Sequence, residues 1–435
     1  MIGKVLVFFI VAILGIGAVG IVLLVPLSLA VVGVLAMTLL LSGSGVPLIY
    51  SLRALTARKG STFLTGLGLA MVVFVFATIL MLCQGIRMTF VSTGSPDNVK
   101  VLRMGSTTEV QSSISAEQVR LLGAAPELAV DAAGRAQLTA ESLAVIFLSK
   151  EGAVDPEDGA NVTVRGIGAQ TLQLRDRLRI DGQMVRPGTS ELVVGRALVG
   201  RFKGLRPGGQ INFGRRQWTV VGVLEGQGTA FDSEIWGDAQ QLNEALQRRG
   251  ILSSMTLRLK APASLAALQA RVEANQQLNS LSLMRESDYY AKQSGGMVNF
   301  IQFLGMFVTS IFGLAAALGA MITMYMQVGS RTREIGILRA LGFRQSAVLV
   351  AFIFESVILG LCAGVVGIAA ASLMRFASFV TTDFQTFSDV SFHFTLTLNI
   401  FGWVLAFSTV LGYCGGLFPA IRASRMSIVD AMRCQ

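Results

Sequence analysis

The stretch RTREIGILRALG, residues 331–342, lies between two long apolar runs. It carries three arginines and a single acidic residue, Glu334. Ile335, Leu338 and Leu341 recur at helical spacing, so the stretch predicts an amphipathic helix. Short basic loops beside membrane spans stay in the cytoplasm. The sequence therefore predicts a cytoplasmic helical hook between two spans, on which a cytosolic partner can act.

The composition of the 435 residues is that of a polytopic membrane protein, since 52% are hydrophobic and only 14% are charged. A soluble protein carries about a quarter charged residues. The formal net charge of +10 is concentrated beside the apolar runs, whereas the long polar middle region is close to neutral. Such an excess indicates membrane topology and contact with lipid headgroups. We expect membrane lipids as partners and no nucleic acid.

Six apolar runs approach the length of roughly 20 residues that a helix needs to cross a bilayer. They are residues 5–25, 27–41, 63–83, 300–326, 347–374 and 398–421. The first run has the alternative of a cleaved signal peptide, but it lacks a small-residue cleavage site. The second is short and either crosses or only dips into the membrane. Placing every basic cluster inside makes both termini cytoplasmic and puts residues 91–296 outside.

The polar region outside predicts a folded domain and not a linker. A capping box at residues 115–118 starts a helix, and Asp238 starts another that Gly250 ends. Alternating segments at 161–168 and 253–260 predict half-buried strands. A hairpin at 211–224 and a helix at 264–278 complete the pattern. The predicted fold class is an α-helical polytopic membrane protein with a large inserted extracytoplasmic α+β domain.

Patterns for catalysis, cofactor binding and metal binding are missing from the sequence. Residues 15–20, GIGAVG, match a dinucleotide fingerprint but lie inside an apolar run, where small residues serve helix packing. Residues 195–201, GRALVGR, lack the lysine and hydroxyl residue of a Walker P-loop. His393 is the only histidine, which argues against a zinc site or a histidine-based triad. We therefore predict no catalytic, cofactor-binding or metal-ligating residue in this chain.

Polar and small residues inside the apolar runs are further candidates. Glu355 lies within the fifth run, where a carboxylate is costly and faces protein or a polar pathway. A helix–helix hydrogen bond is favoured over a proton or substrate site. Gly360 with Gly364, and Gly412 with Gly416, form small-xxx-small faces that let helices approach closely. These faces fit a compact bundle or a dimer seam equally well.

Separated motifs resemble the MacB/FtsX-like permeases of ABC transporters, the type VII or mechanotransmission architecture. They are SLRALTARKGSTFLTGLGLAMVVFVFA at 51–77, ELVVGRALVGRFKGLRPGGQINFGRRQWTVVGVLEGQGTAFDSEIWGDA at 191–239, RTREIGILRALGFRQSAVLVAFIFESVILGLCAGVVG at 331–367 and GLFPAIRASRMSIVDAMR at 416–433. The similarity runs from about residue 47 to the end. It implies four core spans with a MacB-like periplasmic domain inserted between the first and the second.

The resemblance also implies a division of the chain into four parts. Residues 1–46 form an extra N-terminal transmembrane hairpin, and residues 47–96 an interfacial helix and the first core span. Residues 97–295 form the extracytoplasmic α+β domain, and residues 296–435 the last three core spans, the coupling helix and a basic tail. The role of the extra hairpin stays open, with anchoring or assembly favoured.

In this family the loop between the second and third core spans is the coupling helix that contacts the ATPase. The resemblance carries that role to the hook. The hook residues are Arg331, Arg333, Glu334, Ile335, Gly336, Leu338, Arg339, Leu341 and Gly342. ATP and magnesium are then expected in a separate cytosolic ATPase subunit, since this chain lacks the ATPase that MacB itself carries.

The resemblance implies an ATP-driven system of the bacterial inner membrane, for efflux or for handling lipoproteins or lipids. Its expected partners are the ATPase, a second permease copy in a homo- or heterodimer, and a periplasmic adaptor or substrate protein. An alternative is an FtsX-like transmembrane switch that regulates an extracytoplasmic hydrolase. A third hypothesis, a membrane-anchored enzyme, is disfavoured because no nucleophile-elbow motif is present.

Overall fold

The computed structural model describes residues 59–155, 157–248, 250–383 and 386–427. The predicted N-terminal hairpin, the interfacial helix before residue 59 and the end of the basic tail lie outside these residues. The described chain divides into two compact units. The helical unit comprises residues 59–84, 300–377 and 394–427, and the α+β unit comprises residues 85–299 and 378–393.

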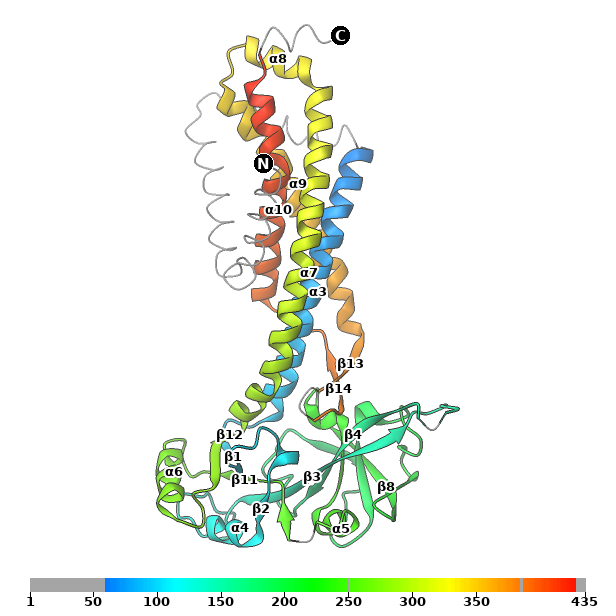
Figure 1. Cartoon of the computed structure of the whole chain (residues 1–435), viewed down its shortest axis with the longest axis vertical. Coiled ribbons are helices and arrows are strands. Elements are labelled where there is room, and N and C mark those ends of the chain that lie inside the picture. Colours follow the sequence, from blue (N-terminus) through cyan, green and yellow to red (C-terminus); the bar gives the residue numbers. More distant parts are fainter. Residues whose placement is uncertain (1–58, 156, 249, 384–385, 428–435) are drawn as a thin grey trace. The chain divides into compact units, whose positions relative to one another are not determined.

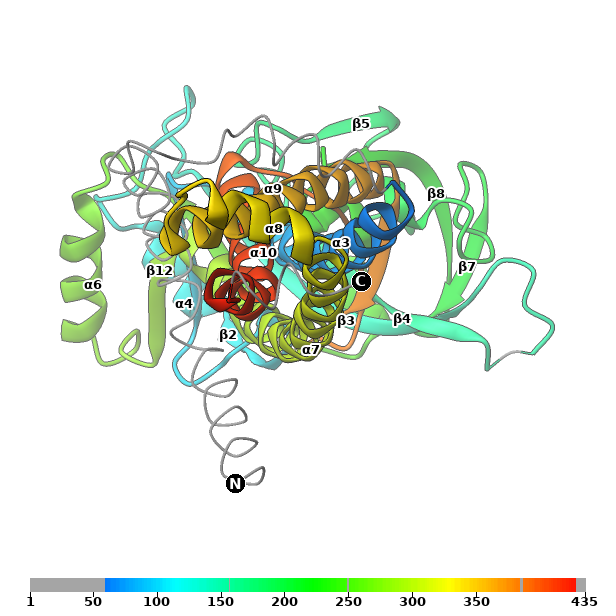
Figure 2. The same cartoon turned by 90° about the horizontal axis from the view of Figure 1, so that it is seen from above.

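Within the described residues, four helices are long and apolar enough to cross a membrane. They are α3 (Lys59–Thr93), α7 (Glu286–Ser330), α9 (Gln345–Ser372) and α10 (Leu398–Arg425). Each contains all or nearly all of one of the last four predicted apolar runs, while α3 and α7 continue beyond their runs into the α+β unit. The short helix α8 (Thr332–Ala340) connects α7 to α9. In Figures 1 and 2, α9 and α10 lie side by side in the bundle.

Glycines set the approach of α9 to α10 within a single chain. A Cβ atom added at Gly360 would lie 2.6 Å from the Ser408 carbonyl oxygen and 3.0 Å from the Gly412 Cα. At Gly364 and Gly416, an added Cβ would collide with the Ser408 and Ser356 hydroxyls, respectively. All four predicted packing glycines therefore lie in the α9–α10 contact, where only a hydrogen atom fits.

The α+β unit contains a ten-stranded mixed sheet in the order β12-β1-β11-β3-β4-β9-β6-β8-β5, with β7 paired to β8. Its strands are β1 (Asn98–Arg103), β3 (Leu138–Ser149), β4 (Gly159–Ile167), β5 (Arg179–Gly182), β6 (Glu191–Gly195), β7 (Gln210–Phe213), β8 (Arg216–Glu225), β9 (Glu234–Asp238), β11 (Ser254–Arg258) and β12 (Leu281–Arg285). The β4–β9 and β6–β8 pairs are parallel and the others antiparallel. Two smaller strand pairs join β2 (Ile114–Ser115) to β10 (Ile251–Leu252) and β13 (Ser378–Thr382) to β14 (Asp389–His393).

Three α-helices, α4 (Ala116–Gly123), α5 (Ala239–Ala245) and α6 (Ser264–Ala274), belong to this unit. The predicted capping box of α4 is confirmed, because the Ser115 and Gln118 side chains each accept a hydrogen bond from the other residue's backbone N–H. The prediction that Gly250 ends α5 is wrong. Gln247 has a φ of 58°, and the Arg248 N–H donates to the Asn243 carbonyl. This Schellman motif ends the helix earlier than a glycine-based prediction expects.

Side chains alternate between the two faces of the sheet, so the apolar cores occupy one set of positions. Val99 and Val101 of β1 belong to a core with residues of α4 and α6. Val162 and Val164 of β4 belong to a second core with residues of α5 and β8. The residues between and after these valines point to the opposite face, and they include Lys100.

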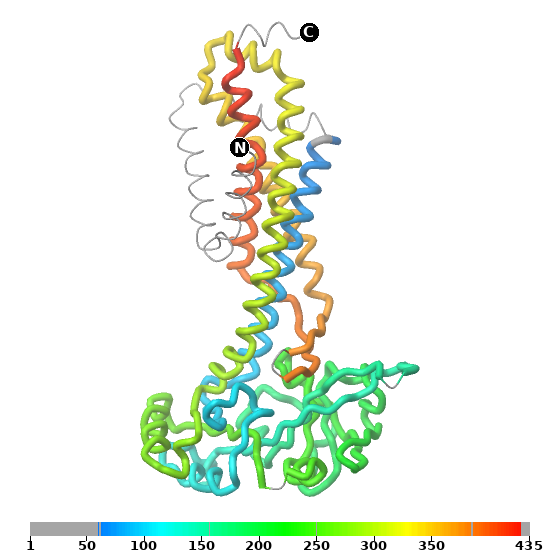
Figure 3. Tube along the Cα trace, in the orientation of Figure 1, coloured from blue at the N-terminus to red at the C-terminus, as the bar shows by residue number. Residues whose placement is uncertain are grey.

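The β13–β14 hairpin belongs to the α+β unit although it connects α9 to α10 (orange in Figure 3). Thr163 of β4 donates a hydrogen bond to the Ser388 hydroxyl (2.9 Å). Arg201 forms an ion pair with Asp389 (3.1 Å). The compact unit therefore extends beyond the predicted residues 97–295 to include a segment that the sequence placed only as an outer loop. His393, the last residue of β14, is exposed as a surface-strand residue.

Candidate functional site

The hook begins and ends with defined backbone hydrogen bonds. The Arg331 carbonyl accepts from the Ile335 N–H (3.0 Å) at the start of α8. At the other end, Phe343 N–H donates to the Leu338 carbonyl and Gly342 N–H to the Arg339 carbonyl. Gly342 has a φ of 95°, so this is a Schellman motif that favours glycine. Gly342 thus shapes the turn from α8 into α9.

The two faces of α8 differ in burial. Ile335 and Gly336 are buried, and Ile335 belongs to an apolar core that includes Val328 of α7 and Val348 of α9. The predicted stripe of Ile335, Leu338 and Leu341 is not one buried face. Leu338 is half-buried, and Leu341 is 72% exposed because α8 ends before it.

The outward face of the hook combines apolar and charged side chains. Arg333, Ile337 and Leu341 follow one another at four-residue intervals, and all three are exposed. Glu334 is exposed beside them, and Arg339 is half-buried. Ile337 lies outside the apolar stripe that the sequence predicted. An exposed surface of this mixed kind is typical of a protein contact.

A buried ion pair ties the start of the hook to α9. The Arg331 Nη1 atom lies 3.1 Å from Glu355 Oε2 and 3.5 Å from Oε1. Both side chains are buried. The sequence favoured a helix–helix hydrogen bond for Glu355, and this carboxylate of α9 accepts a charged one from Arg331, the N-cap residue of α8. A buried carboxylate requires such a partner. The arginines of the hook were the signal in the sequence that could have identified it.

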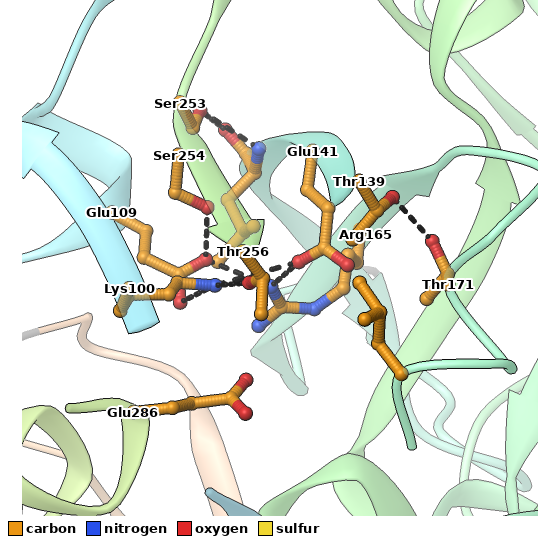
Figure 4. A network of polar contacts seen from close by, with 12 residues as sticks. Lys100, Glu109, Thr139, Glu141, Arg165, Thr171, Ser253, Ser254, Thr256 and Glu286 are labelled. Carbon is orange, nitrogen blue, oxygen red and sulfur yellow. Dashed lines mark hydrogen bonds and ion pairs between the residues drawn. The ribbon is translucent and has the colours of Figure 1, made fainter. Parts of the chain in front are cut away.

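The polar face of the large sheet carries a second group of charges, which we call the buried charge cluster (Figure 4). Its members are Lys100 of β1, Glu109, Glu141 of β3, Arg165 of β4, Arg175, Glu234 of β9 and Glu286 of α7. All seven side chains are nearly or fully withdrawn from solvent.

Glu141 is the carboxylate that contacts all three bases of the cluster. It lies 2.7 Å from Arg165, 2.6 Å from Arg175 and 3.5 Å from Lys100. Although burial alone would raise its pKa, these bases hold the pKa of Glu141 well below its usual range. The pKa of Glu109 is also lowered against the effect of burial, chiefly by Arg165 and Lys100. Glu141 and Glu109 are therefore held as carboxylates beside these bases.

The cluster fixes the first turn of α7 and the end of α3 to the sheet. Glu286 accepts hydrogen bonds from the Ser95 N–H (3.1 Å) and the Asn98 amide (3.0 Å). A Cβ added at Gly94 would lie 2.6 Å from the Glu286 backbone, so only glycine permits this approach. The Thr93 hydroxyl accepts from the Ala230 N–H (2.8 Å). Both long helices are thus joined to the sheet by short, buried contacts.

Sequence reasoning missed the whole buried charge cluster. Lys100 lies between Val99 and Val101, and Arg165 directly follows Val164. A base in a strand this apolar points to a buried partner of opposite charge, which was the usable signal. Nothing local identifies Glu141 or Glu286 as that partner, because those contacts join distant segments.

The chemistry open to these groups is structural. Each base of the cluster already contacts at least one carboxylate, which leaves no free nucleophile or acid–base pair in it. Among the residues that the structure describes, no three His, Cys, Asp or Glu side chains are grouped so as to hold a metal. The arrangement instead joins the first turn of α7, a candidate membrane span, firmly to a sheet.

Two family models match the chain. The MacB-like periplasmic core domain matches residues 62–275, and the FtsX-like permease C-terminal domain matches residues 306–428. The first match includes α3 and most of the α+β unit, including the cluster members from Lys100 to Glu234. The second includes the hook, α9 and α10.

Similar proteins include the macrolide export ATP-binding/permease protein MacB of Vibrio parahaemolyticus, 25% identical over 63% of this chain and 43% of that protein. MacB of Escherichia coli strain K12 is 29% identical over 49% of this chain and 33% of its own length. The chain thus spans less than half the length of these relatives.

Two solved structures are also similar. The extracellular domain of the noncanonical ABC-type transporter YknZ from Gram-positive bacteria gives a TM-score of 0.31 at 16% identity, over 43% of this chain and all of that one. The periplasmic region of MacB from Actinobacillus actinomycetemcomitans gives 0.33 at 11% identity, over 45% of this chain and 92% of that one.

Proposed function

Because this chain belongs to the MacB/FtsX-like permeases of ABC transporters, we propose that it transmits the work of a cytosolic ATPase to the outer face of a bacterial inner membrane. The ATPase partner binds and hydrolyses ATP, and a second permease copy completes the membrane part. The process served is efflux or the handling of lipoproteins or lipids.

The continuity of α7 is the observation that carries this proposal. The helix is unbroken from Glu286 to Ser330, which is 45 residues and about 68 Å of helix. Its first turn is held in the buried charge cluster, and its last residue is followed directly by the hook. We propose that α7 carries a displacement of the hook to the α+β unit, in the manner of rigid-body transmission.

The exposed face of the hook supports contact with a partner. Two apolar side chains of the hook are exposed to solvent, Ile337 at 46% and Leu341 at 72%. The span of α7 supports contact with lipid or with a second copy, since only 22% of its most apolar window is buried, compared with 61% for α9. Phe303, Phe307 and Ile311 are exposed on it.

The decisive variant is Leu341→Asp, measured with the co-purified ATPase in reconstituted membranes. We expect membrane insertion and yield to be unchanged and permease-stimulated ATP hydrolysis to fall at least tenfold, because a charge replaces an apolar contact. Ser346→Asp is the matched control, since it adds the same charge at an exposed position nearby. Equal hydrolysis in both variants and the unaltered protein would refute the coupling role.

Gly342→Arg is a poorer test, because its effect would combine a strained turn with any lost contact. The side of the membrane is tested with a cysteine introduced at Leu341, and not at the buried Gly336. Labelling of that cysteine in intact cells by a reagent that does not cross the membrane would place the hook outside and overturn the proposal. Crosslinking from the α+β unit to a hydrolase instead of an adaptor would support the signalling alternative.

A further inference from the structure

A polar cavity of about 230 Å³ lies in the α+β unit where three segments meet. The end of α3 and the residues after it form one wall, residues 92–97. The turn at residues 174–178 forms another, and Thr229 and Phe231 complete the lining together with Arg258. The first wall begins with the last two residues of the candidate membrane span Thr62–Thr93.

Two buried polar atoms in this lining have no hydrogen-bond partner among the residues that the structure describes. They are Arg175 Nε and Thr229 Oγ1. Both residues are more than nine-tenths buried, at 6% and 5% exposed. The Nη atoms of Arg175 donate to Glu141, and its guanidinium stacks over the Phe231 ring at 4.6 Å, so the Nε–H remains for another acceptor. An unpaired buried donor is costly unless an acceptor occupies the space beside it.

The charges around the cavity favour an anion. Arg175, Arg177 and Arg258 line it against Asp97 and Asp176. Arg177 is exposed. Arg258 donates to the Asn98 side chain and the Leu174 carbonyl and lies 3.7 Å from Asp176, which offsets part of its charge.

A neighbouring cavity extends the same positive surface. It measures about 240 Å³ and shares Pro96, Asp97, Asp176 and Arg258 with the first. Its lining adds the bases Lys260 and Arg285 and no further acid. Oriented bases around a partly enclosed space concentrate anions there.

We propose that this cavity binds a phosphate monoester or diester, with the phosphate oxygens accepting from Arg175 Nε–H and the Thr229 hydroxyl. A volume of about 230 Å³ lies below the roughly 300 Å³ of an ordinary ligand pocket. It therefore accommodates a phosphate with a small polar group such as glycerol, and not acyl chains. The phosphate comes either from a lipid headgroup at the outer end of α3 or from a small soluble ester.

The soluble source is tested by calorimetric titration of the purified full chain with glycerol 3-phosphate, without nucleotide. We expect saturable binding that weakens at least tenfold in Thr229→Val and in Arg177→Glu. Thr229→Val removes only an unpartnered hydroxyl, and Arg177 is exposed, so both variants should fold. The matched control is Arg179→Glu, an exposed position two residues further on that does not line either cavity. We expect it to bind like the unaltered chain.

The lipid source is tested by native mass spectrometry of the full chain released from nanodiscs of phosphatidylglycerol or phosphatidylcholine. We expect the unaltered chain to retain at least threefold more phosphatidylglycerol, and Thr229→Val and Arg177→Glu to lose that preference. A preference without glycerol 3-phosphate binding identifies the lipid as the source. Absence of both, or equal behaviour of these variants and Arg179→Glu, overturns the proposal. Neither measurement depends on ATP hydrolysis, so the coupling role stands or fails separately.

Discussion

Buried charges occur in both units, but their arrangement differs. In the α+β unit, seven charged side chains form the buried charge cluster, where Glu141 alone contacts three bases. In the helical unit, Arg331 and Glu355 form a buried ion pair. Removing any member of a network deprives the remaining buried charges of a partner, whereas both members of a pair can be replaced together. We therefore expect the cluster to hold its segments together as one unit. We expect the Arg331–Glu355 pair to act as a latch, a contact between the hook and α9 that two apolar side chains can replace.

The largest expected effect is that of Glu141→Leu, which leaves three buried bases short of a carboxylate. We expect the free energy of unfolding of the α+β unit to fall by about 3–5 kcal/mol. Thermal unfolding of the full chain, followed by the fluorescence of the buried Trp218 and Trp236, should show a midpoint lower by about 10 °C or more.

Adding Lys100→Met to Glu141→Leu should not restore stability, because Arg165 and Arg175 still lack their contacts with Glu141 and Glu109 also loses its ion pair with Lys100. Glu127→Gln is the control, since its partner Arg271 is half-exposed and such pairs contribute about 0–1 kcal/mol. A full recovery in the double variant would show that the cluster is a sum of independent pairs.

The next effect is that of Arg331→Met and Glu355→Met. Each single variant leaves one buried charge without its partner, so we expect a loss of about 3–5 kcal/mol. The double variant should regain most of that loss, because apolar side chains of similar size replace both ions. The measurement is the fraction of detergent-solubilised protein that stays monodisperse after heating.

The same three variants separate stability from transmission. If the pair is a latch between the hook and α9, the double variant should be stable but poor in permease-stimulated ATP hydrolysis. A double variant that is stable and still fully stimulates ATP hydrolysis would show that the pair contributes only to packing. No recovery of stability at all would mean that the pair belongs to a wider network.

A smaller effect is expected from Gly360→Ala, which tests how tightly the helical unit is packed without involving charge. The added methyl would meet the Ser408 carbonyl and the Gly412 Cα, both backbone atoms that cannot rotate away. We expect a cost of about 1–3 kcal/mol, measured by the same heating assay. Gly402→Ala, on α10 with no atom within 4 Å of the added Cβ, should be neutral or slightly stabilising. Similar losses in both variants would argue against the close α9–α10 contact.

The smallest expected effect is that of pH on the unfolding midpoint near neutrality, through titration of Glu141 and Glu109. The folded-state pKa values of Glu141 and Glu109 lie below those of the unfolded chain, so their contribution is complete above about pH 5. It is lost as the pH falls through the lowered values. The unfolding midpoint of the α+β unit should be flat from pH 8 to 5 and decrease below about pH 4. A decline between pH 8 and 5 would contradict the lowered pKa values of Glu141 and Glu109.

The sequence predicted elements whose signals are local, and it missed contacts between distant segments. The capping box at Ser115 and the last four apolar runs need only neighbouring residues, and they appear where expected. The pairing of Arg331 with Glu355 depends on how the hook turns back towards α9, which the Schellman motif at Gly342 determines. Glu141 and Glu286 meet the same base, Arg175, only after the sheet has formed and α7 has docked on it.

The predicted face of α8 shows a further limit of periodicity. Ile335, Leu338 and Leu341 share a helical spacing, but the helix ends before Leu341, so the last member turns outward. Periodicity indicates which residues share a face while the helix lasts. It does not indicate where the helix ends or which face meets a partner.

The strand pair between α9 and α10 bears on how this protein is divided for experiments. A soluble fragment cut at residues 97 and 295 would omit that hairpin, and Thr163 and Arg201 would lose the groups they bind. Such a fragment would expose polar groups that the hairpin covers in the full chain, and candidate partners could bind to them. A fragment with residues 378–393 attached through a short linker should keep these groups covered and suit binding experiments better.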